Sequence, residues 1–205
     1  GGLVPMLPGA NRVADNRFSQ RGTEVQLPLH NADERFFLHG DGWLKRWEIA
    51  DVTDDSCRLC LRSQLACGYD YLAELQYVLE ASVLRASLTI VHLGKRPMLY
   101  GCGFHPFFVF DAQSTVQFSA SGYWPEGEHH LPLAWQSELP AEVDFTRSQY
   151  GADRWLNVGY SGWSGQAVIR RGVMNITISA QTPWLMLFRM PGQSFLCLEP
   201  QTHPV

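Results

Sequence analysis

Two ionisable residues lie in apolar segments of the sequence, and a role in proton transfer is one explanation for their position. Glu199 closes the segment SFLCLEP, in which Phe195 and Cys197 share its face of an extended strand and two leucines occupy the other face. An ionised carboxylate is costly to bury there, so Glu199 needs partners or a raised pKa, unless it reaches solvent at the turn. His105, in GCGFHPFF, is either a core histidine or a functional one. Together the two groups could serve general acid–base catalysis, with one removing a proton and the other delivering one.

Further polar and aromatic residues lie close to predicted turns. His39 in FFLHGDGW stands beside a hairpin-turn signal, Arg12 in PGANR suits a surface ion pair, and Asp153 in GADRW suits a turn cap. Trp47 is one of several tryptophans near glycine, proline or charged residues. Such rings either cap a sandwich or pack against the CH faces of sugars, with charged side chains binding the hydroxyl groups.

Metal chemistry is a weaker interpretation of the same residues. His39, His105 and Glu199 would form a two-histidine, one-carboxylate site. His129 and His130, in a predicted loop, would need further donors nearby. The sequence lacks the closely spaced H-x-H run of a cupin, so no metal or other cofactor is predicted.

The elements that must position these residues are predicted to be strands. VLRASLTIVHL and VMNITISA alternate apolar and polar residues, and RWEIADV, TVQFSA, QAVIRR, WLMLFR and SFLCLE are short segments of the same kind. The 18 glycines and 12 prolines suit many turns. We predict an all-β chain with a large antiparallel β-sandwich, and a short helical turn near Ser148 to Trp155.

Composition limits the class of protein. The chain has 205 residues, within the range of one all-β domain, and we predict a single domain over residues 1–205. A net charge of -4 offers no basic surface for nucleic acid or membrane, and no signal segment opens the chain. Of the 5 cysteines, Cys57 and Cys60 form a C-x-x-C on one predicted strand, where the thiols would point to opposite faces. Free thiols favour a reducing, cytoplasmic location.

Five blocks, in order along the chain, resemble the aldose 1-epimerase (galactose mutarotase) family. They are LVPMLPGANRVADNRF, LHGDGWLKRW, MLYGCGFHPFF, ADRWLNVGYSGWSG and SFLCLEPQTHP. One departure is Phe107, where the family usually has tyrosine after the His-Pro pair. The resemblance implies the large β-sandwich of that family, and a chain that lacks the family's N-terminal strands and its C-terminal strand.

The resemblance also implies roles for seven residues. Glu199 would be the general base that takes the proton of the C1 hydroxyl group, and His105 the general acid that protonates the ring oxygen of a free aldose such as galactose or glucose. The residues that would bind or position the sugar are Asn11, Arg12, His39, Asp153 and Trp47. No cofactor is needed, because ring opening involves no redox change.

Two other functions on the same fold remain open from sequence. An epimerase for phosphorylated hexoses would need extra Arg or Lys at the pocket, and no such cluster lies near the five blocks. A carbohydrate-binding protein without activity would bind sugar and leave its anomers unchanged.

Overall fold

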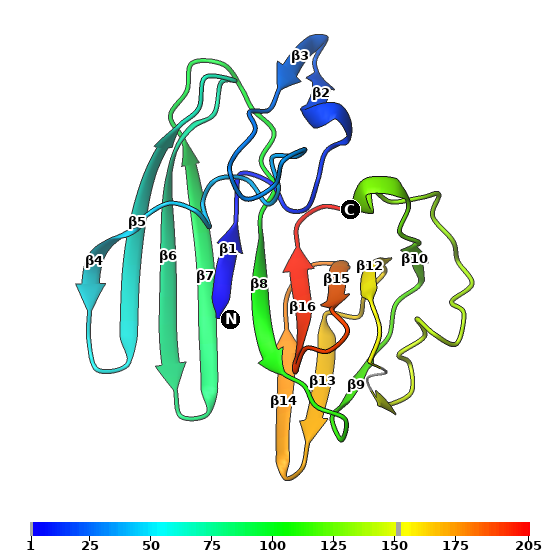
Figure 1. The fold of residues 1–205 in the computed structure, drawn as a ribbon. Helices are drawn as coiled ribbons and strands as arrows, with labels where there is room; N and C mark the ends of the chain where they lie inside the picture. Colours follow the sequence, from blue (N-terminus) through cyan, green and yellow to red (C-terminus); the bar gives the residue numbers. More distant parts are fainter. Residues whose placement is uncertain (1, 151–152) are drawn as a thin grey trace. The chain divides into compact units, whose positions relative to one another are not determined.

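The computed structural model describes residues 2–150 and 153–205, and the predicted all-β architecture is confirmed (Figure 1). Its strands divide into two compact units. Unit 1 comprises Gly1–Val4 and Gly101–Val205, and unit 2 comprises Pro5–Tyr100.

Unit 1 contains a six-stranded sheet in the order β1-β8-β16-β15-β12-β10, except for Pro5 and Met6 at the end of β1, which belong to unit 2. Its strands are β1 (Leu3–Met6), β8 (Gly103–Val109), β10 (Gly122–Trp124), β12 (Leu156–Ser161), β15 (Trp184–Arg189) and β16 (Phe195–Gln201). The pairs β8–β16, β16–β15, β15–β12 and β12–β10 are antiparallel. This sheet carries both residues of the predicted acid–base pair, on β8 and β16.

A four-stranded sheet completes the sandwich of unit 1. It follows the order β11-β9-β13-β14, with β9 (Thr115–Phe118), β11 (Gln149–Tyr150), β13 (Gln166–Arg171) and β14 (Met174–Ser179). Both sheets contribute to one buried cluster, which includes Val116, Phe118 and Ile169 from the smaller sheet and Leu187 and Leu198 from the larger one. Because alternate residues of a strand face opposite ways, the larger sheet directs its other face away from this core.

Unit 2 is built on a meander in the order β4-β5-β6-β7, with a separate β2–β3 hairpin. The strands are β2 (Arg17–Gln20), β3 (Thr23–Gln26), β4 (Glu48–Val52), β5 (Ser56–Gln64), β6 (Asp70–Glu80) and β7 (Val83–His92), and Figure 1 shows the long β6–β7 hairpin in green-cyan. In β5, Cys57 pairs with Tyr77, whereas Cys60 pairs with Glu74. The two thiols therefore lie on opposite faces, as the alternation predicts, and all 5 cysteines are free.

Helical structure in the described residues is confined to two short 3₁₀ turns, Ala14–Asn16 and Glu128–His130. The prediction of a helical turn near Ser148 to Trp155 is wrong where it can be compared. Gln149–Tyr150 form β11 because they pair with Val116 and Thr115, and residues 151 and 152 lie outside the described range. None of the described helices is long and apolar enough to span a membrane.

The backbone next to His39 requires a glycine at position 40. Its φ is +69°, and an added Cβ would overlap the carbonyl oxygen of Leu7, which accepts hydrogen bonds from the N–H groups of Asp41 and Gly42 at 3.0 and 3.1 Å. Gly40→Ala is expected to lower the free energy of unfolding by at least about 2 kcal/mol, since a left-handed residue alone costs about 1–2 kcal/mol.

The matched control for this substitution is Gly22→Ala. Gly22 has φ +77°, but nothing lies within 4 Å of the added Cβ, so only the backbone penalty applies. Urea unfolding of both variants measures the difference, and equal losses of stability would contradict the steric argument.

Candidate active site

His105 and Glu199 meet on the face of the six-stranded sheet that points away from the core of unit 1. The Nε2 atom of His105 lies 3.2 Å from Oε1 of Glu199. The glutamate is 1% exposed and the histidine 9%. On β16, Leu196 and Leu198 join the core, so Glu199 occupies the opposite face, as the alternation predicts. The alternative in which the carboxylate escapes to solvent is therefore wrong.

Aromatic rings surround the imidazole of His105. Phe107 stacks on it with ring centroids 4.7 Å apart and planes 20° apart, and Phe188 meets it edge-on at 6.3 Å. Phe195 in turn lies 5.2 Å from Phe107. The phenylalanine at position 107 thus retains the flat ring of the family's tyrosine while supplying no hydroxyl group.

Burial controls the charge of His105. It lowers the pKa of the imidazole from 6.5 to about 4, because the charged form loses hydration. The carboxylate of Glu199 at 3.2 Å acts in the opposite direction, since it favours an imidazolium. We conclude that burial dominates, so that the imidazole is neutral near pH 7 when no ligand is bound.

In unit 2, Asn11 and His39 hold each other in unusual backbone conformations. Their φ angles are 56° and 57°, in the left-handed region that few non-glycine residues adopt. The backbone N–H of Asn11 donates to Nδ1 of His39 at 3.0 Å, and the N–H of His39 donates to the carbonyl of Asn11 at 3.0 Å. Because Nδ1 accepts a hydrogen bond, it carries no proton, and Nε2–H of His39 is the donor. Backbone strain of this kind is concentrated at functional sites.

Arg12 follows Asn11 and forms an ion pair with Asp33, with Nη2 and Oδ2 3.7 Å apart. Burial of Asp33 opposes ionisation, yet backbone N–H donors from Arg35 and Phe36, together with Arg12, lower the pKa of this carboxyl group. The prediction that Arg12 forms an ion pair is therefore confirmed. A second use of its guanidinium on a ligand remains a prediction.

Asp41 anchors the segment that carries His39, a role that the sequence pattern alone does not indicate. Asp41 is 6% exposed and accepts hydrogen bonds from Tyr71 Oη at 2.6 Å and Ser63 Oγ at 2.6 Å. Lys45 Nζ lies 2.9 Å from the same carboxylate. The tight turn that the Asp-Gly pair predicts is present, with the N–H of Leu44 donating to the carbonyl of Asp41 at 3.1 Å, but it does not connect two paired strands as a hairpin would. A buried carboxylate with three partners fixes the loop on β5 and β6 instead.

The two remaining predicted residues have structural contacts of their own. Trp47 donates its Nε1–H to the carbonyl of Gly42 at 2.8 Å in unit 2. Asp153 in unit 1 accepts the N–H of Gly192 at 2.7 Å. The structure therefore brings His105 to Glu199 and Asn11 to His39, while Trp47 and Asp153 each contact a glycine.

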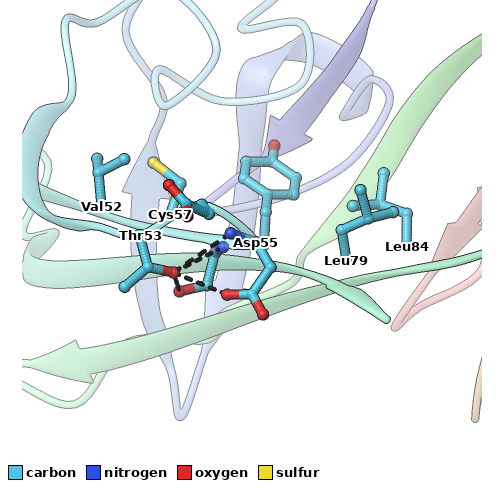
Figure 2. Close-up of a pocket in the computed structure, with 9 residues that line it drawn as sticks. Val52, Thr53, Asp55, Cys57, Leu79 and Leu84 are labelled. Carbon is cyan, nitrogen blue, oxygen red and sulfur yellow. Dashed lines mark hydrogen bonds between the residues drawn. The ribbon is translucent and has the colours of Figure 1, made fainter. Parts of the chain in front are cut away.

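A separate depression lies at the β4–β5 turn of unit 2 (Figure 2). Its volume is about 250 Å³, and its lining is Val52, Thr53, Asp54, Asp55, Ser56, Cys57, Tyr77, Leu79 and Leu84. Thr53 Oγ1 lies 2.8 Å from Asp55 Oδ1 and 2.7 Å from Ser56 Oγ, so these groups stabilise the turn. None of the predicted site residues lines this depression.

The sequence as a whole matches one family model. The model of aldose 1-epimerase matches residues 4–205. The chain belongs to the aldose 1-epimerase family. The uncharacterised protein YphB of Escherichia coli K12 is 35% identical over 211 residues, and the alignment covers 97% of this chain and 72% of YphB.

Solved structures agree with this membership. A crystal structure of a protein from Escherichia coli K12, provisionally assigned as an aldose 1-epimerase, matches with a TM-score of 0.95 and 33% identity, over 100% of this chain and 74% of that one. A galactose mutarotase-like protein from Clostridium acetobutylicum matches with a TM-score of 0.80 and 17% identity, over 100% and 70%. The second likeness concerns the fold alone. Together they place the chain in the galactose mutarotase-like fold that the sequence predicts.

Proposed function

We propose that this protein is an active aldose 1-epimerase that interconverts the α and β anomers of free aldohexoses. The observation that carries the proposal is the buried contact of 3.2 Å between His105 and Glu199. A carboxylate and an imidazole at this separation lie within reach of two oxygens on one carbon centre, which the hemiacetal of an aldose supplies. Family membership supports the reaction class.

The proposed cycle conserves protons and electrons. Glu199 as carboxylate takes the proton of the C1 hydroxyl group, and the C1–O5 bond breaks with its electron pair moving to O5. His105 acts in its imidazolium form, a minor form near pH 7 that takes its proton from solvent and grows as pH falls, and it protonates O5, which gives the open-chain aldehyde. Rotation about C1–C2 presents the other face of the carbonyl, and the reverse transfers close the ring and restore both side chains.

The remaining predicted residues are proposed to hold the sugar. His39 would donate from Nε2–H to a sugar oxygen, because its Nδ1 is occupied by the N–H of Asn11. Asp153 would accept from hydroxyl groups, Arg12 would donate, and Trp47 would present an apolar ring to the sugar. These roles rest on the family resemblance of their sequence blocks. The 5 free thiols also favour our proposal of a cytoplasmic location.

Polarimetry of freshly dissolved α-D-galactose and α-D-glucose tests the proposal. We expect optical rotation to relax faster with the protein than in buffer, before and after dialysis against a chelator. Preference for glucose 6-phosphate would favour the phosphohexose alternative. Sugar binding without acceleration would favour the carbohydrate-binding alternative, and activity lost to the chelator and restored by a divalent metal would favour a metal site.

A further inference from the structure

A second carboxylate, Glu126, organises a cluster near the proposed catalytic pair in unit 1. Its Oε2 atom accepts the indole N–H of Trp155 at 2.6 Å, and its Oε1 atom accepts the amide N–H of Asn157 at 2.6 Å. The Nδ1 atom of His130 lies 2.5 Å from the same Oε1 atom. Short hydrogen bonds to an ionised acceptor are stronger than neutral ones, so this carboxylate fixes the orientation of the Trp155 ring.

Strand register places the cluster beside His105 and Glu199. Asn157 pairs with Phe188 across β12 and β15, and Phe188 pairs with Cys197 across β15 and β16. Cys197 is two residues before Glu199 on the same strand, so Asn157, Phe188 and the catalytic carboxylate share one face of the sheet.

Aromatic contacts connect Trp155 to the imidazole. The Trp155 ring meets Phe188 edge-on, with centroids 5.4 Å apart and planes at 87°. Phe188 in turn meets His105 at 6.3 Å. A single ring, that of Phe188, therefore separates the indole from the proposed acid.

Exposure distinguishes Trp155 from a core residue. It remains 41% exposed, although its N–H is satisfied and its ring is held on one side by His130 at 5.3 Å and on another by Phe188. An indole that is fixed in orientation and still exposed presents a rigid apolar surface to a ligand, with little entropy to lose on binding.

We propose that Trp155 contacts the apolar CH face of the aldopyranose, and that Glu126 is the residue that positions the indole. This inference rests on the proposed function, because it takes the sugar to bind at His105 and Glu199. It adds to the site a wall formed by the start of β12 and by the 125–130 segment. The start of β12 lies in the block ADRWLNVGYSGWSG, where the resemblance assigns a role to Asp153 and none to Trp155.

Three substitutions test the inference, with anomer exchange and sugar binding as separate readouts. Trp155→Ala is expected to raise KM about five- to tenfold and to leave kcat within about twofold, because stacking acts equally on the ground and transition states. Trp155→Phe should recover part of the loss. Glu126→Gln should raise KM less than Trp155→Ala, because it weakens the orientation of the ring without removing it.

Each substitution should also raise the dissociation constant for galactose, in the same order as it raises KM. Calorimetry in a Glu199→Gln background measures this constant. Trp135→Phe is the matched control, since Trp135 is 47% exposed and its N–H donates to Ser161 at 2.7 Å, at the other end of β12. Circular dichroism and Tm establish that each variant folds.

An unchanged KM and dissociation constant in folded Trp155→Ala would overturn the inference, as would an equal loss in Trp135→Phe. Binding without exchange in the unaltered protein would instead overturn the proposed function. The effect of Trp155 on the dissociation constant would then still decide the inference.

Discussion

Glu199→Gln and His105→Gln are each expected to lower kcat by about 10²–10⁴-fold, the contribution typical of one general acid or base. Glutamine retains the size of the glutamate and can still accept a hydrogen bond, but it cannot take a proton from the C1 hydroxyl group. KM should change little, because the lost proton transfers occur in the transition state. Since the two residues act as a unit, the double variant should be little slower than the slower single variant.

The control for these variants is Glu138→Gln, which removes an exposed carboxylate from the same unit. Stopped-flow or coupled measurement of anomer exchange gives kcat and KM for each protein. Activity within about threefold of the unaltered protein in both single variants would contradict the assigned roles.

The second large effect concerns stability at acid pH. Burial lowers the pKa of His105 from 6.5 to about 4, so between these values the unfolded chain binds a proton that the folded protein excludes. The contribution of His105 to the free energy of unfolding is therefore fully present above pH 6.5, and it is lost as pH falls toward 4. Over the whole interval the loss amounts to about 3 kcal/mol.

The same shift predicts that kcat/KM rises as pH falls from 8 to 6, because the imidazolium fraction grows.

Urea unfolding at pH 7 and at pH 4.5 measures this loss of unfolding free energy. Ordinary carboxylates also lower stability in acid, so the comparison is between the unaltered protein and His105→Gln. The variant should lose less free energy of unfolding on acidification, whereas the exposed His129→Gln should behave like the unaltered protein. An equal loss in His105→Gln would show that the imidazole is not held neutral by burial.

Most of the sheet structure follows from local patterns. The alternation in SFLCLE assigned Glu199 to the face opposite the two leucines because a strand exposes successive side chains to opposite sides, and QAVIRR forms a strand as predicted. The same rule separated Cys57 from Cys60. The prediction of a helical turn around Gln149 was wrong because a two-residue strand is defined by its pairing with β9, a contact distant in sequence.

The site was predictable only in part. The burial of Glu199 was left open by the pattern, because an end residue can face solvent or a neighbouring strand, and β8 decides the matter by bringing His105 to it. The Asp41-Gly42 pair does begin a turn beside His39, since the N–H of Leu44 donates to the carbonyl of Asp41 at 3.1 Å, but the pattern carries no information on the buried partners of the Asp41 carboxylate. Glu126 and Trp155 are 29 residues apart, and no spacing rule connects them.

The most direct test of the proposed function is NMR exchange spectroscopy of galactose labelled with ¹³C at C1, at anomeric equilibrium near pH 7. It reports the interconversion of α and β signals without any net reaction. We predict exchange cross-peaks with the unaltered protein, well above those of buffer, and their loss in Glu199→Gln. Broadened sugar signals without exchange in the unaltered protein would contradict the proposal, since they would show a site that binds the sugar and does not open its ring.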